Sequence, residues 1–260
     1  MRTERAFLII FVMLGVANRA QAELLSPSVS VAGRTQNEWA EAWWNWTLSF
    51  PEASNPVTDT TGAFANLGDQ GKVFFLAGHF GGAGPVTRRA TVRRNQYLFL
   101  PLANGVTTVL DSSYGPSYDE MRQDVIEFVG EGSGFYAELD GTSLAGGRDL
   151  NDWLQLSPDV FTLEFPPGGI FTGGDYTGPI DSVQRGWWLM LAPLEVGTYT
   201  LRFGGMATPT GIYSDFDPNV QDVTYILTVV PEPSSLALSA SALGLAGVVA
   251  LMRGRRPVSV

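Results

Sequence analysis

The 260-residue chain contains no cysteine and a single histidine, His79. Without cysteine it forms no disulfide bond and offers no thiol nucleophile. Zinc sites use several His or Cys ligands, so one histidine argues against zinc. A Ser-His-Asp triad would have to use His79, which follows a predicted strand in a glycine-rich stretch with no serine in a nucleophile-elbow context. We therefore predict a protein that is not an enzyme, with no catalytic residues, no metal and no cofactor.

The chain begins with the pattern of a secretory signal peptide. Two arginines precede an apolar run over residues 6–17, and Ala20 and Ala22 supply the small residues of a cleavage site. We expect the secretion machinery to export the protein and residues 1–22 to be removed. The exported domain should then begin at Glu23.

The last thirty residues combine three features in a fixed order. A Pro-Glu-Pro motif comes first, and residues 236–252 follow without a single charge. At about 1.5 Å per residue, this segment nearly crosses a hydrocarbon core roughly 30 Å thick. A cluster of arginines ends the chain and should stay cytoplasmic. The residues of the motif and of the cluster are Pro231, Glu232, Pro233, Arg253, Arg255 and Arg256.

This order of motif, transmembrane helix and basic tail resembles the PEP-CTERM sorting signal of Gram-negative bacteria, here over residues 231–260. The resemblance implies that an exosortase in the inner membrane recognises the precursor and cleaves it near the motif. The protein would then be a membrane-anchored precursor first and later reach the cell surface or the extracellular matrix. The alternative is an ordinary membrane anchor that is never cleaved.

Positive charge is scarce in the part between the two signals, residues 23–230. The signals hold six of the 16 basic and two of the 26 acidic residues, which leaves 10 basic and 24 acidic residues and a net charge near −14. Such a balance argues against nucleic acid and anionic membrane surfaces as partners. At 208 residues the domain is long enough to form a core without disulfides.

Two helices are predicted in this domain. Thr35 and Glu38 form a capping box, as do Ser117 and Glu120, and Gly130 is placed to end the second helix. The first helix carries an aromatic stripe, and one further tryptophan, Trp44, lies off it. The stripe consists of Trp39, Trp43, Trp46 and Phe50.

From Asn55 onward, short apolar runs alternate with Gly, Pro, Asn and Asp, which is typical of β-strands. Strands are predicted at residues 72–77, 86–92, 96–100, 106–110, 135–139, 160–165, 186–191, 198–203 and 222–230. The first and third are almost continuously apolar, which predicts burial on both faces. We expect a mainly β fold, a β-sandwich of the jelly-roll or immunoglobulin-like kind with two helical insertions.

Several segments are similar to a widespread group of exported bacterial proteins. They are the tryptophan-rich helix, Gln70 to Gly78, Leu98 to Asn104 and Trp187 to Gly197. The resemblance covers most of residues 23–230 and implies export and a common β-rich fold, but no activity. Many members have two cysteines near Ala65 and Ala90 and a histidine at Tyr199. This chain lacks all three, so no disulfide or metal role is carried over.

Candidate ligand-binding residues are of two kinds. The tryptophans either stack on sugar rings or pack on a sheet, and helical spacing favours packing. Four arginines lie within seven residues and either bind an anionic polysaccharide or pair with carboxylates at a sheet edge. The possible ligand surface consists of Trp44, Arg88, Arg89, Arg93 and Arg94.

Acidic residues allow two further hypotheses. The segment from Asp215 to Asp222 carries oxygen ligands at alternate positions, but Val220 stands where a calcium-binding EF-hand loop requires glycine. A carboxylate pair could also hydrolyse glycosidic bonds, but the sequence nominates none of the 24 acidic residues. The leading hypothesis is a non-enzymatic structural or adhesive protein of the cell surface. The alternatives are a carbohydrate-binding module of the extracellular polymer matrix and, less favoured, a matrix-modifying glycoside hydrolase.

Overall fold

The computed structural model describes residues 22–80, 84–170 and 178–232. Most of the predicted signal peptide, Pro233, the predicted span at 236–252 and the three C-terminal arginines lie outside these ranges. Within the described ranges, no helix is long and apolar enough to cross a membrane. Ala22, the last residue of the predicted signal peptide, and Pro231 and Glu232 of the sorting motif are described.

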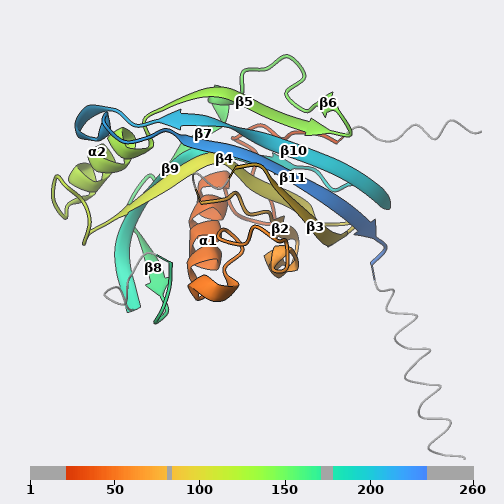
Figure 1. The fold of residues 1–260 in the computed structure, drawn as a ribbon, viewed down its shortest axis with the longest axis horizontal. Helices are drawn as coiled ribbons and strands as arrows, with labels where there is room; N and C mark the ends of the chain where they lie inside the picture. The colour runs from red at the N-terminus through yellow and green to blue at the C-terminus, as the bar shows by residue number, and fades with distance from the viewer. Residues whose placement is uncertain (1–21, 81–83, 171–177, 233–260) are drawn as a thin grey trace, which may run out of the picture.

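The described residues form a mainly β fold with two sheets and two α-helices (Figure 1). The first sheet contains β1 (Asp69–Gln70), β2 (Val73–Phe75), β4 (Tyr97–Thr108), β9 (Gly178–Leu191) and β7 (Leu154–Leu156) in that order, and β8 (Phe161–Phe165) also pairs with β9. The second sheet has the order β3 (Val86–Arg93), β11 (Asn219–Val230), β10 (Gly197–Thr208), β5 (Glu131–Leu139) and β6 (Thr142–Ser143). The helices are α1 (Gln36–Leu48) and α2 (Tyr118–Val129), and short 3₁₀ turns include η2 (Ala65–Gly68), η3 (Leu150–Trp153) and η4 (Gly211–Tyr213).

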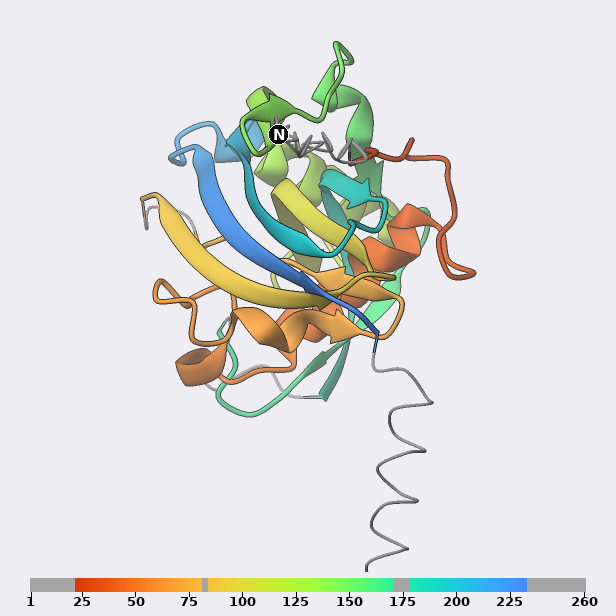
Figure 2. The same cartoon turned by 90° about the vertical axis from the view of Figure 1, so that its right-hand side faces the viewer.

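The two sheets enclose an apolar core. Side chains alternate between buried and exposed along β3 and β10, as expected for strands with one face toward a core. Leu100 and Leu189 from the first sheet join Leu201 and Phe203 from the second in one buried cluster. Figure 2 shows β3 alongside β11 at the edge of the second sheet, where the two strands pair in parallel.

The other face of the first sheet is covered by α1 (Figure 1). The Thr35 side chain accepts a hydrogen bond from the Glu38 N–H, so the predicted capping box is confirmed. The ring centroids of Trp43 and Trp188 lie 5.2 Å apart, and the Trp188 ring stacks on Phe99 with a centroid distance of 5.3 Å. The tryptophan stripe therefore packs on the sheet. This also explains the continuous hydrophobicity of β2 and β4, because both faces of these strands are buried, as predicted.

The second helix, α2, covers the end of β4 and β9 on the side of the second sheet. Its cap at Ser117 is the predicted one, and Met121, Val125 and Val129 contribute to the core between the sheets. Gly130 ends the helix with a φ of +68°, and a Cβ there would lie 1.8 Å from the Thr208 carbonyl oxygen. Only glycine fits at this position.

Two of the predicted strands are one strand in the structure. Residues 96–100 and 106–110 were expected to form two strands, because Pro101 and Gly105 lie between them. They form the single strand β4, which shifts register at Pro101 and continues along β9. Gly105 belongs there because a Cβ would approach the Val129 side chain to 2.6 Å. Glycine thus marks the close packing of α2 and not the end of a strand.

Candidate functional site

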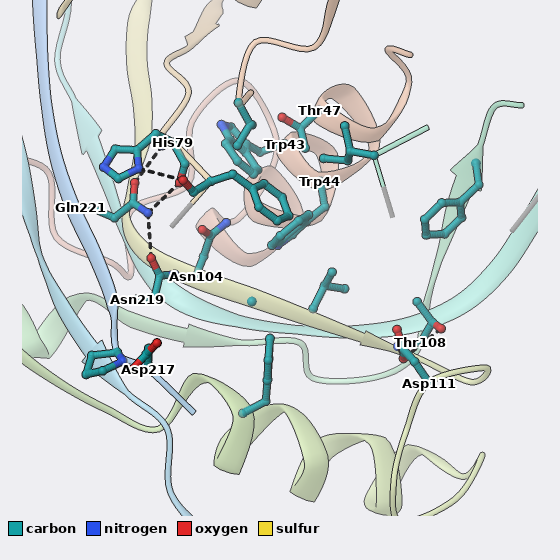
Figure 3. Close-up of a pocket in the computed structure, with 18 residues that line it drawn as sticks. Trp43, Trp44, Thr47, His79, Asn104, Thr108, Asp111, Asp217, Asn219 and Gln221 are labelled. Carbon is teal, nitrogen blue, oxygen red and sulfur yellow. Dashed lines mark hydrogen bonds between the residues drawn. The ribbon is translucent and has the colours of Figure 1, made fainter. Parts of the chain in front are cut away.

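A cleft of about 590 Å³ opens between α1, the second half of β4 from Asn104 to Thr108, and residues 217–221 at the start of β11 (Figure 3). Trp43, Trp44 and Thr47 line it from α1, and Asn104, Thr108 and neighbouring residues line it from β4. Further lining residues come from the end of β8, from α2 and from residues 217–221. This volume is in the range of sites that bind small organic molecules.

Aromatic side chains form much of the cleft. Trp43 and Trp44 meet edge to face at 5.4 Å, and the Trp43 indole N–H donates to the Leu76 carbonyl over 3.0 Å. Phe80 and Phe128 also line the cleft and are partly exposed. Trp44 itself is only 6% exposed, so it is a fixed part of the wall and not a protruding platform.

Two polar atoms in this wall have no hydrogen-bond partner among the described residues. They are the Thr47 hydroxyl oxygen and the Asn104 side-chain nitrogen, Nδ2. Thr47 is 1% exposed, and both residues line the cleft. Buried polar groups are nearly always hydrogen-bonded, so these two atoms are unusual, and a molecule in the cleft could supply the missing partners.

The upper end of the cleft, at His79, is held by a tight set of hydrogen bonds (Figure 3). The Gln221 side chain accepts from the His79 N–H over 2.8 Å and donates to the His79 carbonyl over 2.7 Å. The His79 Nε2 accepts from the Asp222 N–H, which assigns the ring proton to Nδ1, where it reaches the Phe80 carbonyl. Both ring nitrogens are therefore engaged, and the histidine has a structural role.

The opposite wall is fixed by the buried carboxylate of Asp124, on α2. It accepts hydrogen bonds from the Thr107 hydroxyl, the Ser113 N–H and the Tyr213 hydroxyl, at 2.7 to 2.9 Å. Burial, together with the hydrogen bond to Asp124, raises the pKa of Tyr213 to about 12. The network joins β4, α2 and η4, so the cleft is bordered by elements that are bonded to one another.

The charge of the cleft is negative. Asp111 and Asp217 line it, and none of the described lining residues is Lys or Arg. In Figure 3 the two carboxylates lie on opposite sides of Asn104. Asp111 is exposed to solvent at one edge but closely surrounded by protein elsewhere, and its Oδ1 accepts from the Thr108 N–H over 2.6 Å. Partial loss of solvation raises the pKa of Asp111, and the nearby charge of Asp124 adds to this effect.

The four arginines of the cluster do not share one surface. Arg88 is 1% exposed, and its guanidinium donates to the carbonyl oxygens of Asp59, Ala77 and Gly78 and to the Tyr225 hydroxyl. Strand alternation places the neighbouring Arg89 on the opposite, exposed face of β3. The prediction for Arg88 is corrected: this side chain joins β3, β11 and the loops before His79.

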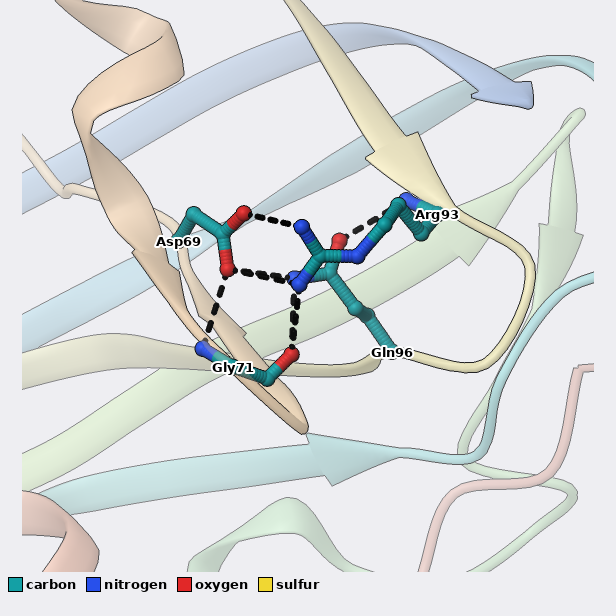
Figure 4. Close-up of polar contacts among 4 residues, drawn as sticks. All are labelled: Asp69, Gly71, Arg93 and Gln96. Atoms are coloured by element: carbon teal, nitrogen blue, oxygen red, sulfur yellow. Dashed lines mark hydrogen bonds and ion pairs between the residues drawn. The ribbon is translucent and has the colours of Figure 1, made fainter. Parts of the chain in front are cut away.

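Arg93 and Arg94 follow the alternative interpretation of the cluster, in which its charges pair with carboxylates. Arg93 forms two hydrogen bonds to the Asp69 carboxylate, at 2.6 and 2.9 Å, and the Gln96 amide bonds the same group (Figure 4). Arg94 pairs with Glu195 at 2.9 Å, where both side chains are exposed. β3 is an edge strand of the second sheet, so these charges lie at the edge.

The remaining candidates fall outside the cleft. Trp39, Trp187 and Trp188 are buried in the cores. The Asp222 carboxylate pairs with Arg202 and accepts from the Tyr136 hydroxyl, so it does not face a shared site with Asp217. Within the part of the chain that the structure describes, no three His, Cys, Asp or Glu side chains gather as a metal site would require.

The residues next to both predicted processing sites are described. The Glu23 carbonyl accepts from the Ala192 N–H and the Leu25 N–H donates to the Met190 carbonyl, at the end of β9, and Ala22 packs in the core between the sheets. Pro231 and Glu232 follow directly after β11 and are exposed.

The cleft itself was not predicted. Of its central residues only Trp44 was a binding candidate; Asn104 belonged to a segment that resembles the exported group, and Thr47, Asp111 and Phe128 carried no functional prediction. They come from α1, β4, the loop after β4 and α2, and only the packing of these elements brings them together. A signal was present in the polar Asn104 inside an otherwise apolar strand, since such a residue needs a partner.

No family model matches this chain. No curated protein and no solved structure matches it either. The chemistry of the cleft is therefore inferred from its own residues.

Proposed function

We propose that this chain is an exported, non-enzymatic protein of the bacterial cell surface or extracellular matrix, and that its cleft binds a saccharide of that matrix. The observation that carries the binding proposal is the combination in one cleft of aromatic walls with two unpartnered polar atoms, the Thr47 hydroxyl oxygen and Asn104 Nδ2. Sugar rings present apolar C–H faces to aromatic side chains and hydroxyls to donors and acceptors.

The proposed sorting rests on the two terminal segments. The exposed Pro231 and Glu232 follow the last strand without a linker, where a membrane-embedded exosortase would meet the folded domain. The predicted helix at 236–252 would hold the precursor in the inner membrane until cleavage. We also propose the finer fold class, a β-sandwich of the jelly-roll or immunoglobulin-like kind, which the face-to-face core of the two sheets supports.

The enzymatic alternative, a matrix-modifying glycoside hydrolase, is less well supported. Such enzymes need two carboxylates on either side of the bond that is cleaved. Among the described lining residues the carboxylates are Asp111 and Asp217, and the charge that acts on Asp111 is that of Asp124, outside the cleft lining, and not that of Asp217. We propose binding without turnover.

The sorting proposal is tested by the intact mass and location of the protein in its host, with and without the triple change Pro231→Ala, Glu232→Ala and Pro233→Ala. We expect the unchanged protein outside the cell without either terminal segment, and the variant full length at its C-terminus in the inner membrane. An unchanged protein that keeps its basic tail in the membrane would contradict sorting by this signal.

The binding proposal is tested by titrating neutral and charged oligosaccharides into the purified full chain in mild detergent. Asn104→Ala removes the unpartnered amide, and Asn151→Ala, on the exposed turn η3, serves as the control. We expect saturable binding that only the cleft variant weakens. Equal binding by both variants would place the ligand elsewhere on the protein.

A further inference from the structure

The cleft also restricts the charge of its ligand. Its described lining contains two carboxylates and no basic side chain, and its one histidine accepts a hydrogen bond at Nε2, as neutral imidazole does. A uronate or a sulfated sugar would therefore meet like charges with no cation to offset them. The anionic polysaccharide considered for the arginine cluster does not suit this site.

Asp111 forms no ion pair with a described residue. Its Oδ1 accepts from the Thr108 N–H and hydroxyl, at 2.6 and 3.0 Å, and no described residue donates to its second oxygen, Oδ2. The ionisable groups that interact with it are Asp124 and Tyr213, neither of which is a cation. The raised pKa of Asp111 agrees with a carboxylate whose negative charge the protein leaves uncompensated.

We propose that the cleft binds an amino sugar with a free, protonated amine, and that Asp111 holds this ammonium group. The inference rests on the proposed saccharide-binding function and adds the chemical class of the sugar. The ammonium would donate to Oδ2, while the sugar hydroxyls reach the Thr47 hydroxyl and the Asn104 amide on the same cleft wall. The aromatic side chains nearby add favourable cation–π contacts.

The observations favour an organic cation over a metal ion. A cleft of about 590 Å³ is far larger than an ion needs, and the described residues nowhere gather three acidic or histidine ligands. Two unpartnered neutral atoms also suit hydroxyl groups better than a bare cation, because a hydroxyl both donates and accepts. Asp217, at the opposite side of the cleft, would contact a further amine in a longer oligomer.

The test is a titration of the full chain in mild detergent, at about pH 6 and low salt, where ordinary carboxyl groups are ionised. Four oligosaccharides of equal length are compared, built from glucosamine, N-acetylglucosamine, glucose and galacturonic acid. Loss of one charged hydrogen bond costs roughly 10- to 100-fold in affinity. We expect glucosamine oligomers to bind about that much more tightly than the N-acetylated ones, and galacturonate to bind least.

Asp111→Asn supplies the matched variant, because it keeps the Oδ1 acceptor and removes only the charge. Asp152→Asn, an exposed aspartate on η3, makes the same charge change outside the cleft. We expect Asp111→Asn to lower the affinity for glucosamine oligomers about 10-fold or more and to leave the N-acetylated ones unchanged. Asp217→Asn, at an exposed position, gives a second cleft variant if the first fails to fold.

The outcomes separate the two proposals. If N-acetylated, neutral or acidic oligomers bind as tightly as glucosamine oligomers and Asn104→Ala weakens them, the amino-sugar inference is overturned while saccharide binding stands. If Asp111→Asn and Asp152→Asn lower affinity equally, the effect is one of net charge and the inference fails. If the folded chain binds none of the four, both proposals fail.

Discussion

The two faces of the first sheet differ in chemistry. The face toward the second sheet is covered largely by aliphatic side chains such as Leu100 and Leu189, both fully buried, and it also holds Trp187, whose indole nitrogen has no hydrogen-bond partner among the described residues. The face toward α1 is covered by tryptophan and phenylalanine, and at one end it opens into the cleft with unpartnered polar atoms. Unpaired polar atoms occur on both faces, but among the described residues those on the face toward α1 line an open cleft. An enclosed face serves stability, whereas unpaired polar atoms that line a cleft are available to a ligand. The following predictions separate these two roles.

The largest loss of stability is expected from a substitution in the core between the two sheets. Phe203 is fully buried and stacks on Tyr225, so Phe203→Ala should lower the free energy of unfolding by about 3–5 kcal/mol. Denaturant titration measures this, and saccharide affinity of the folded fraction should not change. A loss under about 1 kcal/mol would mean that the two sheets are not packed as described.

A somewhat smaller effect is expected from Arg88, which joins the two layers. Arg88→Met removes the donors to three buried carbonyl groups and should cost roughly 2–3 kcal/mol of stability. Arg88→Lys should lose most of the same free energy, because an ammonium cannot reproduce the planar fork of a guanidinium. If the lysine variant unfolds at the same denaturant concentration as the parent, the positive charge alone matters and the hydrogen-bond geometry does not.

A substitution in the cleft should lower ligand affinity and leave stability almost unchanged. Asn104→Ala removes an amide nitrogen that has no partner, so stability should change by less than about 0.5 kcal/mol. Affinity for the saccharide should fall about 10-fold, as for the loss of one or two hydrogen bonds. Thermal unfolding and titration of the same sample measure both. A destabilised variant with unchanged affinity would assign Asn104 to the core.

The smallest effect concerns pH. The pKa of Asp111 is raised above its ordinary value of 3.8, so the folded state binds its proton more tightly than the unfolded state does. The contribution of Asp111 to the free energy of unfolding is therefore present at acid pH. It is lost as the pH rises through the folded-state pKa of Asp111. Asp111→Asn should therefore stabilise the protein at neutral pH and not below about pH 3.5. Screening by solvent limits the gain to a few tenths of a kcal/mol. Melting temperatures across this range test the sign.

The sequence predicted those elements whose formation depends on neighbouring residues. Both capping boxes and the helix end at Gly130 follow local rules, and the structure contains all three. The buried strands were also predictable, because residues covered on both faces are apolar throughout.

What the sequence did not predict depends on contacts between distant residues. Gly105 interrupts a strand pattern only to admit α2, and Arg88 is buried because loops from residues 59 and 77–78 bring carbonyl groups to it. Neither fact can be inferred from the neighbours of these residues in the chain. The cleft is the same kind of feature, since its polar atoms become a site only when α1 covers β4.

The most direct test of the central claim is a crystal structure of the protein bound to a glucosamine oligomer. We predict a sugar ring in the cleft, in contact with Trp44 and within hydrogen-bond distance of Asn104 Nδ2, and its amine on Asp111. A sugar bound at the arginine-bearing edge of β3, with the cleft empty, would contradict the assignment of this cleft as the functional site.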